Sequence, residues 1–228
     1  MNTILLVLAI GHFSDHPDPI SAYQVRTVEG FRVLVHPRVL EHATDAAAAM
    51  TELRAQLKAI ARVVPAKPLA DLRKVAIWIE WDAKPNGAAE FHRSADWLRD
   101  NGYNVDKVGA VEINNARSFV AWSRQNQPWM VMHELAHAYH HRVLKPDHAG
   151  IADAFRQAVK SGRYESVAYG KEGKKKAYAL TDSYEYFAEM TESYFGRNDF
   201  EPFDRADLKA FDPVAYQLMR DVWGDPLT

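Results

Sequence analysis

The sequence predicts an α+β fold in which strands come first and helices follow. Alternating apolar residues over 23–28 and 31–35, separated by a Glu-Gly pair, are typical of a β-hairpin. Two further apolar runs, 75–81 and 108–113, predict strands. The second half of the chain contains mainly helical patterns. We therefore expect a mixed N-terminal sheet with helices and then a helical part, rather than a regular alternation of strand and helix.

The predicted helices follow one another along the chain. Residues 45–64 have apolar side chains at helical spacing, and Ser94 is a suitable N-cap for a short helix. Segments 164–169 and 176–180 flank a lysine-rich, solvated turn and predict a second hairpin. Gly196 is a suitable C-cap for the helix that precedes it. The remaining helices are expected over residues 116–123, 128–143, 151–160, 183–195 and 212–223.

Composition limits the classes of protein to which the chain can belong. Its 228 residues are 47% hydrophobic and 25% charged, which suits one globular domain with a sizeable core. A net charge of -2 argues against nucleic acid as a partner, because no basic field is present to attract phosphates. No stretch approaches the ~20 apolar residues of a membrane span. Cysteine is absent, so any metal must be held by His and carboxylate ligands.

The N-terminus resembles a short secretory signal. Residues 4–10 form an apolar run, and a polar, proline-containing segment follows it. No Lys or Arg precedes the run, and no clear cleavage site follows. We expect a leader over residues 1–20, one domain over 21–228 and a secreted or extracytoplasmic protein. The alternatives are a buried first strand and a cytoplasmic location.

The chemistry of the chain is concentrated in the helix predicted over 128–143, where His133, Glu134 and His137 form the pattern H-E-x-x-H. Residues four apart share one face of a helix, so both imidazoles can bind one ion. Glu134 lies about 100° round the axis, where it can act as a general base. This arrangement is typical of zinc hydrolases.

A chance match with two ordinary histidines is the alternative interpretation. The first half of this helix is apolar nearly all round, which predicts a buried helix. Polar side chains inside it need partners, since each unpaired buried group costs about 1–3 kcal/mol. A metal ion would supply those partners.

The residues alone leave the third ligand open. The longer pattern H-E-x-x-H-x-x-G-x-x-H fails, because His140 takes the glycine position and Val143 the position of the last histidine. His140 and His141 are expected beside the metal ligands rather than among them. Weaker candidates are His92 and His148.

Glu185 is the carboxylate candidate, with Glu189 four residues later to orient a ligating imidazole. Two other interpretations compete with this one. Asp182 and Glu185 have the spacing of a capping box, and Glu185, Glu189 and Glu192 could form a solvated helix face.

Tyr178, Glu185 and the following run Tyr-Phe-Ala-Glu, some fifty residues after H-E-x-x-H, resemble the catalytic domain of the anthrax-toxin lethal factor peptidase family. The resemblance covers roughly residues 105–200 and implies a zincin-like fold, here in a secreted bacterial branch of these glutamate zincins. The first hundred residues have no counterpart to the toxin's docking domains, so neither a toxin role nor its substrate is implied.

The resemblance also assigns roles to individual residues. It implies one Zn²⁺ per chain held by His133, His137 and Glu185, with Glu189 orienting a ligand. Glu134 would be the base that activates water for attack on a peptide bond, and Tyr178 the oxyanion donor.

The strand predicted over 108–113 has a further implied role. As an edge strand it would bind an extended peptide or protein substrate through Ala110, Val111 and Glu112. An ordinary core strand is the alternative.

Two other functions compete with a zinc peptidase. One is an inactive zinc-bearing binding protein, which the intact Glu134 argues against. The other is a zinc hydrolase of non-peptide amides. The shape of the site distinguishes a peptidase from an amide hydrolase. A long groove beside an edge strand suits peptides, and a closed pit suits small amides.

Overall fold

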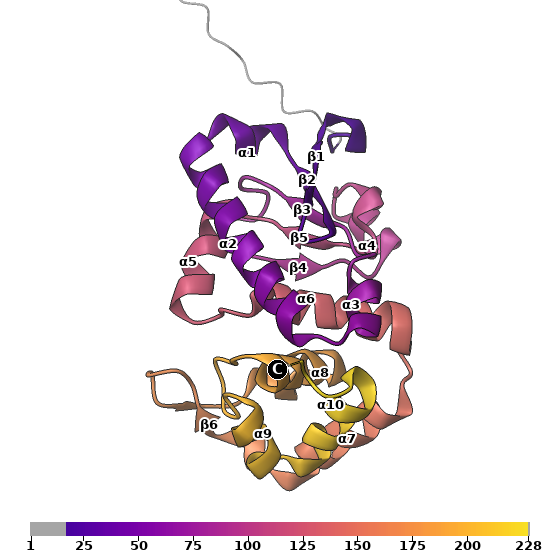
Figure 1. The fold of residues 1–228 in the computed structure, drawn as a ribbon, viewed down its shortest axis with the longest axis vertical. Helices are drawn as coiled ribbons and strands as arrows, with labels where there is room; N and C mark the ends of the chain where they lie inside the picture. The colour runs from indigo at the N-terminus through magenta and orange to yellow at the C-terminus, as the bar shows by residue number, and fades with distance from the viewer. Residues whose placement is uncertain (1–16, 228) are drawn as a thin grey trace, which may run out of the picture.

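The computed structural model describes residues 17–227 and has the predicted α+β architecture (Figure 1). Five strands form one mixed sheet in the order β1-β2-β3-β5-β4. The β1–β2 and β4–β5 pairs are antiparallel, and β2–β3 and β3–β5 are parallel. The strands are β1 Gln24–Val28, β2 Phe31–Val35, β3 Ile77–Ile79, β4 Glu90–Phe91 and β5 Val111–Ile113.

The sheet buries side chains on both faces. Val33, Ile77 and Val111 belong to the main hydrophobic core, whereas Leu34 and Trp78 pack on the opposite face. This explains why the middle strands read as continuous apolar runs rather than as an alternation of apolar and polar residues.

The sheet half of the molecule contains the first six α-helices (Figure 1). The predicted helix at 45–64 corresponds to α2, and Ser94 caps α4 by accepting from the Trp97 N–H, so both predictions are confirmed. Helices α1 and α3 were not predicted. The bounds are α1 Pro37–Glu41, α2 Ala43–Val63, α3 Ala66–Leu72, α4 Ala95–Asp100, α5 Ala116–Gln125 and α6 Met130–Tyr139.

The rest of the described chain forms a helical half that lies below the sheet in Figure 1. Its most extensive contact with the sheet half is made by α8, which packs against α6. A small hairpin of β6 Val167–Ala168 and β7 Lys174–Lys175 lies between the helices in sequence. The helices are α7 Ala149–Ser161, α8 Ser183–Phe195, α9 Arg205–Phe211 and α10 Pro213–Trp223.

Two predicted elements differ from the structure in their second parts. The helix expected over 128–143 is α-helical only to Tyr139 and continues as the π-helical segment His140–Leu144. The hairpin expected to extend over 176–180 is shorter, because Tyr178–Leu180 forms a 3₁₀ turn. The pattern of apolar residues could not distinguish a π-helical segment from a regular α-helix, or a 3₁₀ turn from a strand.

Helix α8 ends at Gly196, as predicted, but for a different reason. Gly196 has φ -151°, so it does not adopt the left-handed conformation of a usual glycine C-cap. A Cβ atom at this position would clash with the indole ring of Trp129. Glycine is therefore required by the close approach of the segment that leads into α6.

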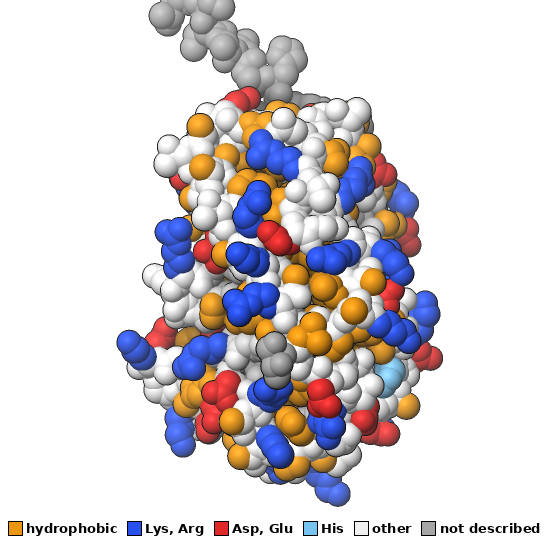
Figure 2. All heavy atoms as spheres, viewed as in Figure 1, with side chains coloured by type: hydrophobic (Ala, Val, Ile, Leu, Met, Phe, Trp, Pro, Cys, Tyr) orange, Lys and Arg blue, Asp and Glu red, His pale blue; other side chains and the backbone are white. Residues whose placement is uncertain are grey.

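The predicted leader falls mostly on residues 1–16, which lie outside the described residues. Within the described part, the Asp18 carboxylate lies 2.8 Å from His36 Nε2, and the Asp18 carbonyl accepts from Asn104. No helix in residues 17–227 is long and apolar enough to cross a membrane. Figure 2 shows Lys and Arg side chains interspersed with Asp and Glu on the viewed face.

Candidate metal centre

Helix α6 places the H-E-x-x-H residues in the interior of the molecule. Nine of its ten residues are buried, and only His133 is partly exposed. His133 and His137 lie one turn apart with ring centroids 4.7 Å from each other. The two imidazoles therefore share one face of the helix, as the spacing predicts.

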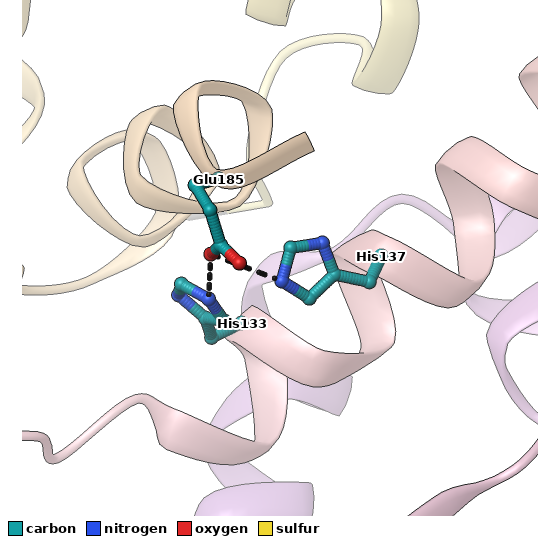
Figure 3. A group of neighbouring side chains, drawn as sticks. All are labelled: His133, His137 and Glu185. Atoms are coloured by element: carbon teal, nitrogen blue, oxygen red, sulfur yellow. Dashed lines mark hydrogen bonds and ion pairs between the residues drawn. The ribbon is translucent and has the colours of Figure 1, made fainter. Parts of the chain in front are cut away.

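The start of α8 brings Glu185 to the two histidines. Asp182 caps this helix by accepting hydrogen bonds from the Tyr184 and Glu185 N–H groups at 2.7 and 3.0 Å. The cap fixes the first turn of α8, from which the Glu185 side chain points to α6 (Figure 3).

One oxygen of Glu185 faces both imidazoles. Glu185 Oε2 lies 3.0 Å from His133 Nε2 and 3.3 Å from His137 Nε2 (Figure 3). Burial alone would raise the pKa of Glu185, but the hydrogen bonds from the two imidazoles outweigh it and hold that pKa well below its usual range. Two imidazoles and one carboxylate whose ligand atoms all lie within 4.8 Å of one another could hold a metal ion.

The donor set fits zinc chemically. Catalytic zinc sites use three protein ligands of this kind and keep one position open. The other two histidine candidates are engaged elsewhere. The His92 ring is 2.5 Å from Glu112 Oε2, and His148 caps α7 by accepting from the Ile151 N–H.

Glu192, which the sequence analysis did not select, orients His133. Its Oε1 atom lies 2.7 Å from His133 Nδ1, whereas Glu189 Oε1 lies 3.6 Å from the same nitrogen. Glu189 instead accepts a hydrogen bond from Asn198 through its other oxygen. Of the two glutamates, only Glu192 is within hydrogen-bond distance of His133 Nδ1. The sequence did contain a signal for Glu192, because Glu189 and Glu192 both lie on the face of α8 that carries Glu185.

Glu134 is buried beside the histidines. The residue is 9% exposed, and burial raises the pKa of its carboxyl group. A carboxylate with a raised pKa is a better proton acceptor near neutral pH than an ordinary glutamate.

Tyr178 begins the 3₁₀ turn before α8 and is 46% exposed. Its ring centroid lies 6.3 Å from that of His133. Burial of the hydroxyl and the nearby Glu185 carboxylate raise the pKa of Tyr178 to about 12. The hydroxyl therefore keeps its proton at neutral pH and can donate a hydrogen bond.

His140 lies behind the site rather than in it. Its ring stacks on Tyr184 with centroids 4.1 Å apart, and neither ring nitrogen has a hydrogen-bond partner among the described residues. Burial lowers the pKa of His140 to about 4. His140 therefore contacts the site as a neutral ring that packs against Tyr184.

The prediction that Ala110, Val111 and Glu112 bind substrate is wrong. Strand β5 is an interior strand, paired with β3 on one side and β4 on the other, and these three residues are buried. The length of the apolar run could not reveal that the short, polar β4 segment covers the outer side of β5.

Strand β4 is the edge strand next to the site. Hydrogen bonds and register direct the backbone groups of Ala88, Glu90 and His92 to β5. In an antiparallel pair the intervening residues point the other way, so the backbone groups of Ala89 and Phe91 face the open edge.

Two adjoining cavities, of about 350 and 300 Å³, meet beside this edge. Both are lined by Ala89, His133, Glu134 and Tyr178. The first extends along Ala88 toward Phe200, and the second along Phe91 toward Asp182. His133, Glu134 and Tyr178 thus lie where the two cavities meet rather than at the closed end of a single pit.

A third cavity, of about 440 Å³, is lined by groups remote from α6 and α8. Two of them, Glu80 and Lys107, form an ion pair of 2.7 Å. The Tyr23 hydroxyl donates to the same Glu80 oxygen at 2.6 Å, so these polar groups satisfy one another.

Comparisons of the chain with protein-family models, curated proteins and solved structures found no match.

Proposed function

We propose that the chain is a zinc-dependent peptidase. The observation that supports this most directly is the convergence of Glu185 with His133 and His137, which come from two helices some fifty residues apart. Two ordinary helix histidines would not require a partly buried carboxylate from another element between them. The ligand set that we propose for one Zn²⁺ is therefore His133, His137 and Glu185.

The chemistry assigned to each residue follows from its surroundings. When bound, Zn²⁺ polarises a carbonyl group and lowers the pKa of water to about 7. Glu134 accepts a proton from the attacking water and delivers it to the leaving amine. The Tyr178 hydroxyl donates a hydrogen bond to the oxygen on which negative charge develops. Glu192 holds the His133 ring through Nδ1.

The shape of the site favours a peptide over a small amide. Ala89 and Phe91 offer unpaired edge groups beside the reacting residues, and an extended peptide can add to a sheet through such groups. Cavities on both sides of Glu134 leave room for residues before and after the cleaved bond.

The Glu134→Gln variant tests this proposal. Gln cannot accept the proton, so we expect hydrolysis of a peptide library to fall by at least ~10²-fold, since general acid–base catalysis contributes about 10²–10⁴. Zinc content, measured by elemental analysis of the purified protein, should stay at one per chain. Hydrolysis by the wild type should also stop when a chelator is added.

Each alternative gives a different result. Retained hydrolysis in Glu134→Gln would reject the base, and a wild type that binds zinc but cleaves no peptide would favour a binding protein or an amide hydrolase. Purified protein without zinc, and unable to take it up, would reject the metal site itself.

A further inference from the structure

The cavity on the Ala88 side of the metal centre has an unusual combination of walls and floor. Its lining combines aromatic and apolar side chains, which we call its walls, with carboxylates, which we call its floor. The wall residues are Trp122, Met130, Tyr169, Tyr178 and Phe200. We call this space the acidic cavity and define its floor as Glu189, Glu192 and Asp199.

The β6–β7 hairpin closes one side of the acidic cavity. Tyr169 pairs with Phe200 through an isolated β-bridge, and their ring centroids lie 4.4 Å apart. The Gly170 N–H donates to the Asp199 carbonyl at 2.9 Å, which fixes the segment that contains Asp199. The start of the hairpin turn therefore supports the wall, while the lysines of the turn are exposed, as predicted.

The floor carboxylates are buried, with exposed fractions of 3% for Glu189, 4% for Glu192 and 8% for Asp199. Glu192 is engaged by His133, and Glu189 by the neutral amide of Asn198. No side chain of residues 17–227 donates a hydrogen bond to the Asp199 carboxylate or forms an ion pair with it; it accepts from the backbone N–H groups of Asp199 and Phe200. Asp199, a residue more than nine-tenths buried and without a cation beside it, lines a cavity that is open to a ligand.

No Lys or Arg side chain among residues 17–227 lines this cavity. The cavity on the other side of Glu134 differs, because Lys84 and Arg93 line it. A bound divalent ion would not neutralise the floor carboxylates either. Its two positive charges would be balanced by the negative charges of Glu134 and Glu185, so the charges of the floor would remain in excess.

The excess negative charge also affects the protonation of the floor. Burial, followed by repulsion from Glu192, raises the pKa of Asp199 to about 6. A cation that enters the cavity would stabilise the charged form of Asp199.

We propose that the acidic cavity binds a lysine or arginine side chain of the substrate next to the cleaved bond. The aliphatic stem of either residue packs well against aromatic walls, while its charged end reaches the carboxylates. A guanidinium group can also bind a carboxylate with two parallel hydrogen bonds. The inference rests on the proposed peptidase function and specifies its substrate class.

Edge-strand pairing indicates which side of the cleaved bond this residue occupies. We place the peptide antiparallel to β4, because antiparallel strand pairs outnumber parallel ones about two- to three-fold. It then runs from the Phe91 end to the Ala89 end. Its residue after the cleaved bond then lies at the Ala88 side, where the acidic cavity begins. The cavity therefore selects the residue that follows the cut.

Matched peptides that differ only in charge test the proposal. In the best-cleaved sequence from a peptide library, the residue after the cut is made arginine or citrulline, which have nearly the same shape. We expect wild-type kcat/KM to be at least ~10-fold higher with arginine, because buried carboxylates left without their cation are costly. In Asp199→Asn this ratio should fall by about tenfold or more. In Glu172→Gln, which removes an exposed charge on the hairpin, it should not change.

Binding of small probes separates this inference from the proposed function. Argininamide should bind the zinc-loaded full chain more tightly than citrullinamide, and Asp199→Asn should abolish the difference, as measured by NMR titration. Cleavage of peptides without preference for arginine would overturn the cavity assignment while the peptidase stands. Selective argininamide binding without any cleavage would support the cavity and reject the peptidase. Equal binding of the two probes would overturn the inference in either case.

Discussion

At the scale of single residues, the orientation of the His133 ring depends on the partner of its second nitrogen. Glu192 Oε1 is 2.7 Å from His133 Nδ1, and this contact would direct Nε2 toward Glu185. Groups that orient metal-binding histidines in this way typically contribute 10–100-fold to metal affinity.

We therefore expect Glu192→Gln to weaken zinc binding by about tenfold. Glu189→Gln is the matched control, because Glu189 lies on the same helix face but 3.6 Å from the same nitrogen. Competition with a chromophoric chelator measures both affinities. A larger loss in Glu189→Gln than in Glu192→Gln would restore the role that the family resemblance implies for Glu189.

At the scale of secondary-structure elements, the first turn of α8 decides where the proposed third ligand lies. The Asp182 carboxylate accepts from two backbone N–H groups of that turn, one of which belongs to Glu185. The sequence spacing of Asp182 and Glu185 favoured either a cap or a ligand. The structure has the cap, formed by Asp182, and directs Glu185 to the histidines.

Asp182→Ala should lower the free energy of unfolding by about 0.5–2 kcal/mol, as for other N-caps. It should also weaken zinc binding, because Glu185 would lose its fixed position. Asp204→Ala is the control, since Asp204 caps α9 through the Ala206 and Asp207 N–H groups. Denaturant unfolding and metal titration of both variants test this link. Equal zinc affinity in the two variants would show that the cap serves stability alone.

At the scale of the whole molecule, the candidate metal centre joins the sheet half to the helical half. Helix α6 belongs to the core beneath the sheet and contributes both histidines, whereas Glu185 comes from α8. The Leu227 N–H also donates to the Val63 carbonyl, which ties the end of the described chain back to α2. A bound ion would add a link between the two halves that only the folded protein can provide.

Zinc should therefore raise the melting temperature. At a free concentration a thousand times the Kd, binding contributes about 4 kcal/mol, or roughly 10 °C for a chain of this size. Calorimetry with zinc and then with excess chelator measures the shift. Glu185→Gln should lose most of it; a shift of the same size in that variant would place the third ligand elsewhere.

The sequence was sufficient for features that depend on local geometry. The spacing of His133, Glu134 and His137 places them on one buried helix, and the alternating residues of 23–28 and 31–35 predict the hairpin, because both periodicities are properties of adjacent turns or residues. The order of strands and helices was enough for the α+β class. The assignment of Glu185 and Tyr178 required a family resemblance, since spacing alone left a solvated helix face equally acceptable.

Other features were decided only by tertiary packing. Strand β4 is two residues long and carries little apolar signal, yet it is the edge strand, so β5 is interior. Glu192 is distinguished from Glu189 by less than one turn of α8 and by the placement of His133. The acidic cavity brings Asp199 and the β6–β7 hairpin together with α6, which ends before residue 140. Such contacts depend on how elements distant in sequence pack against one another, and no local periodicity records that arrangement.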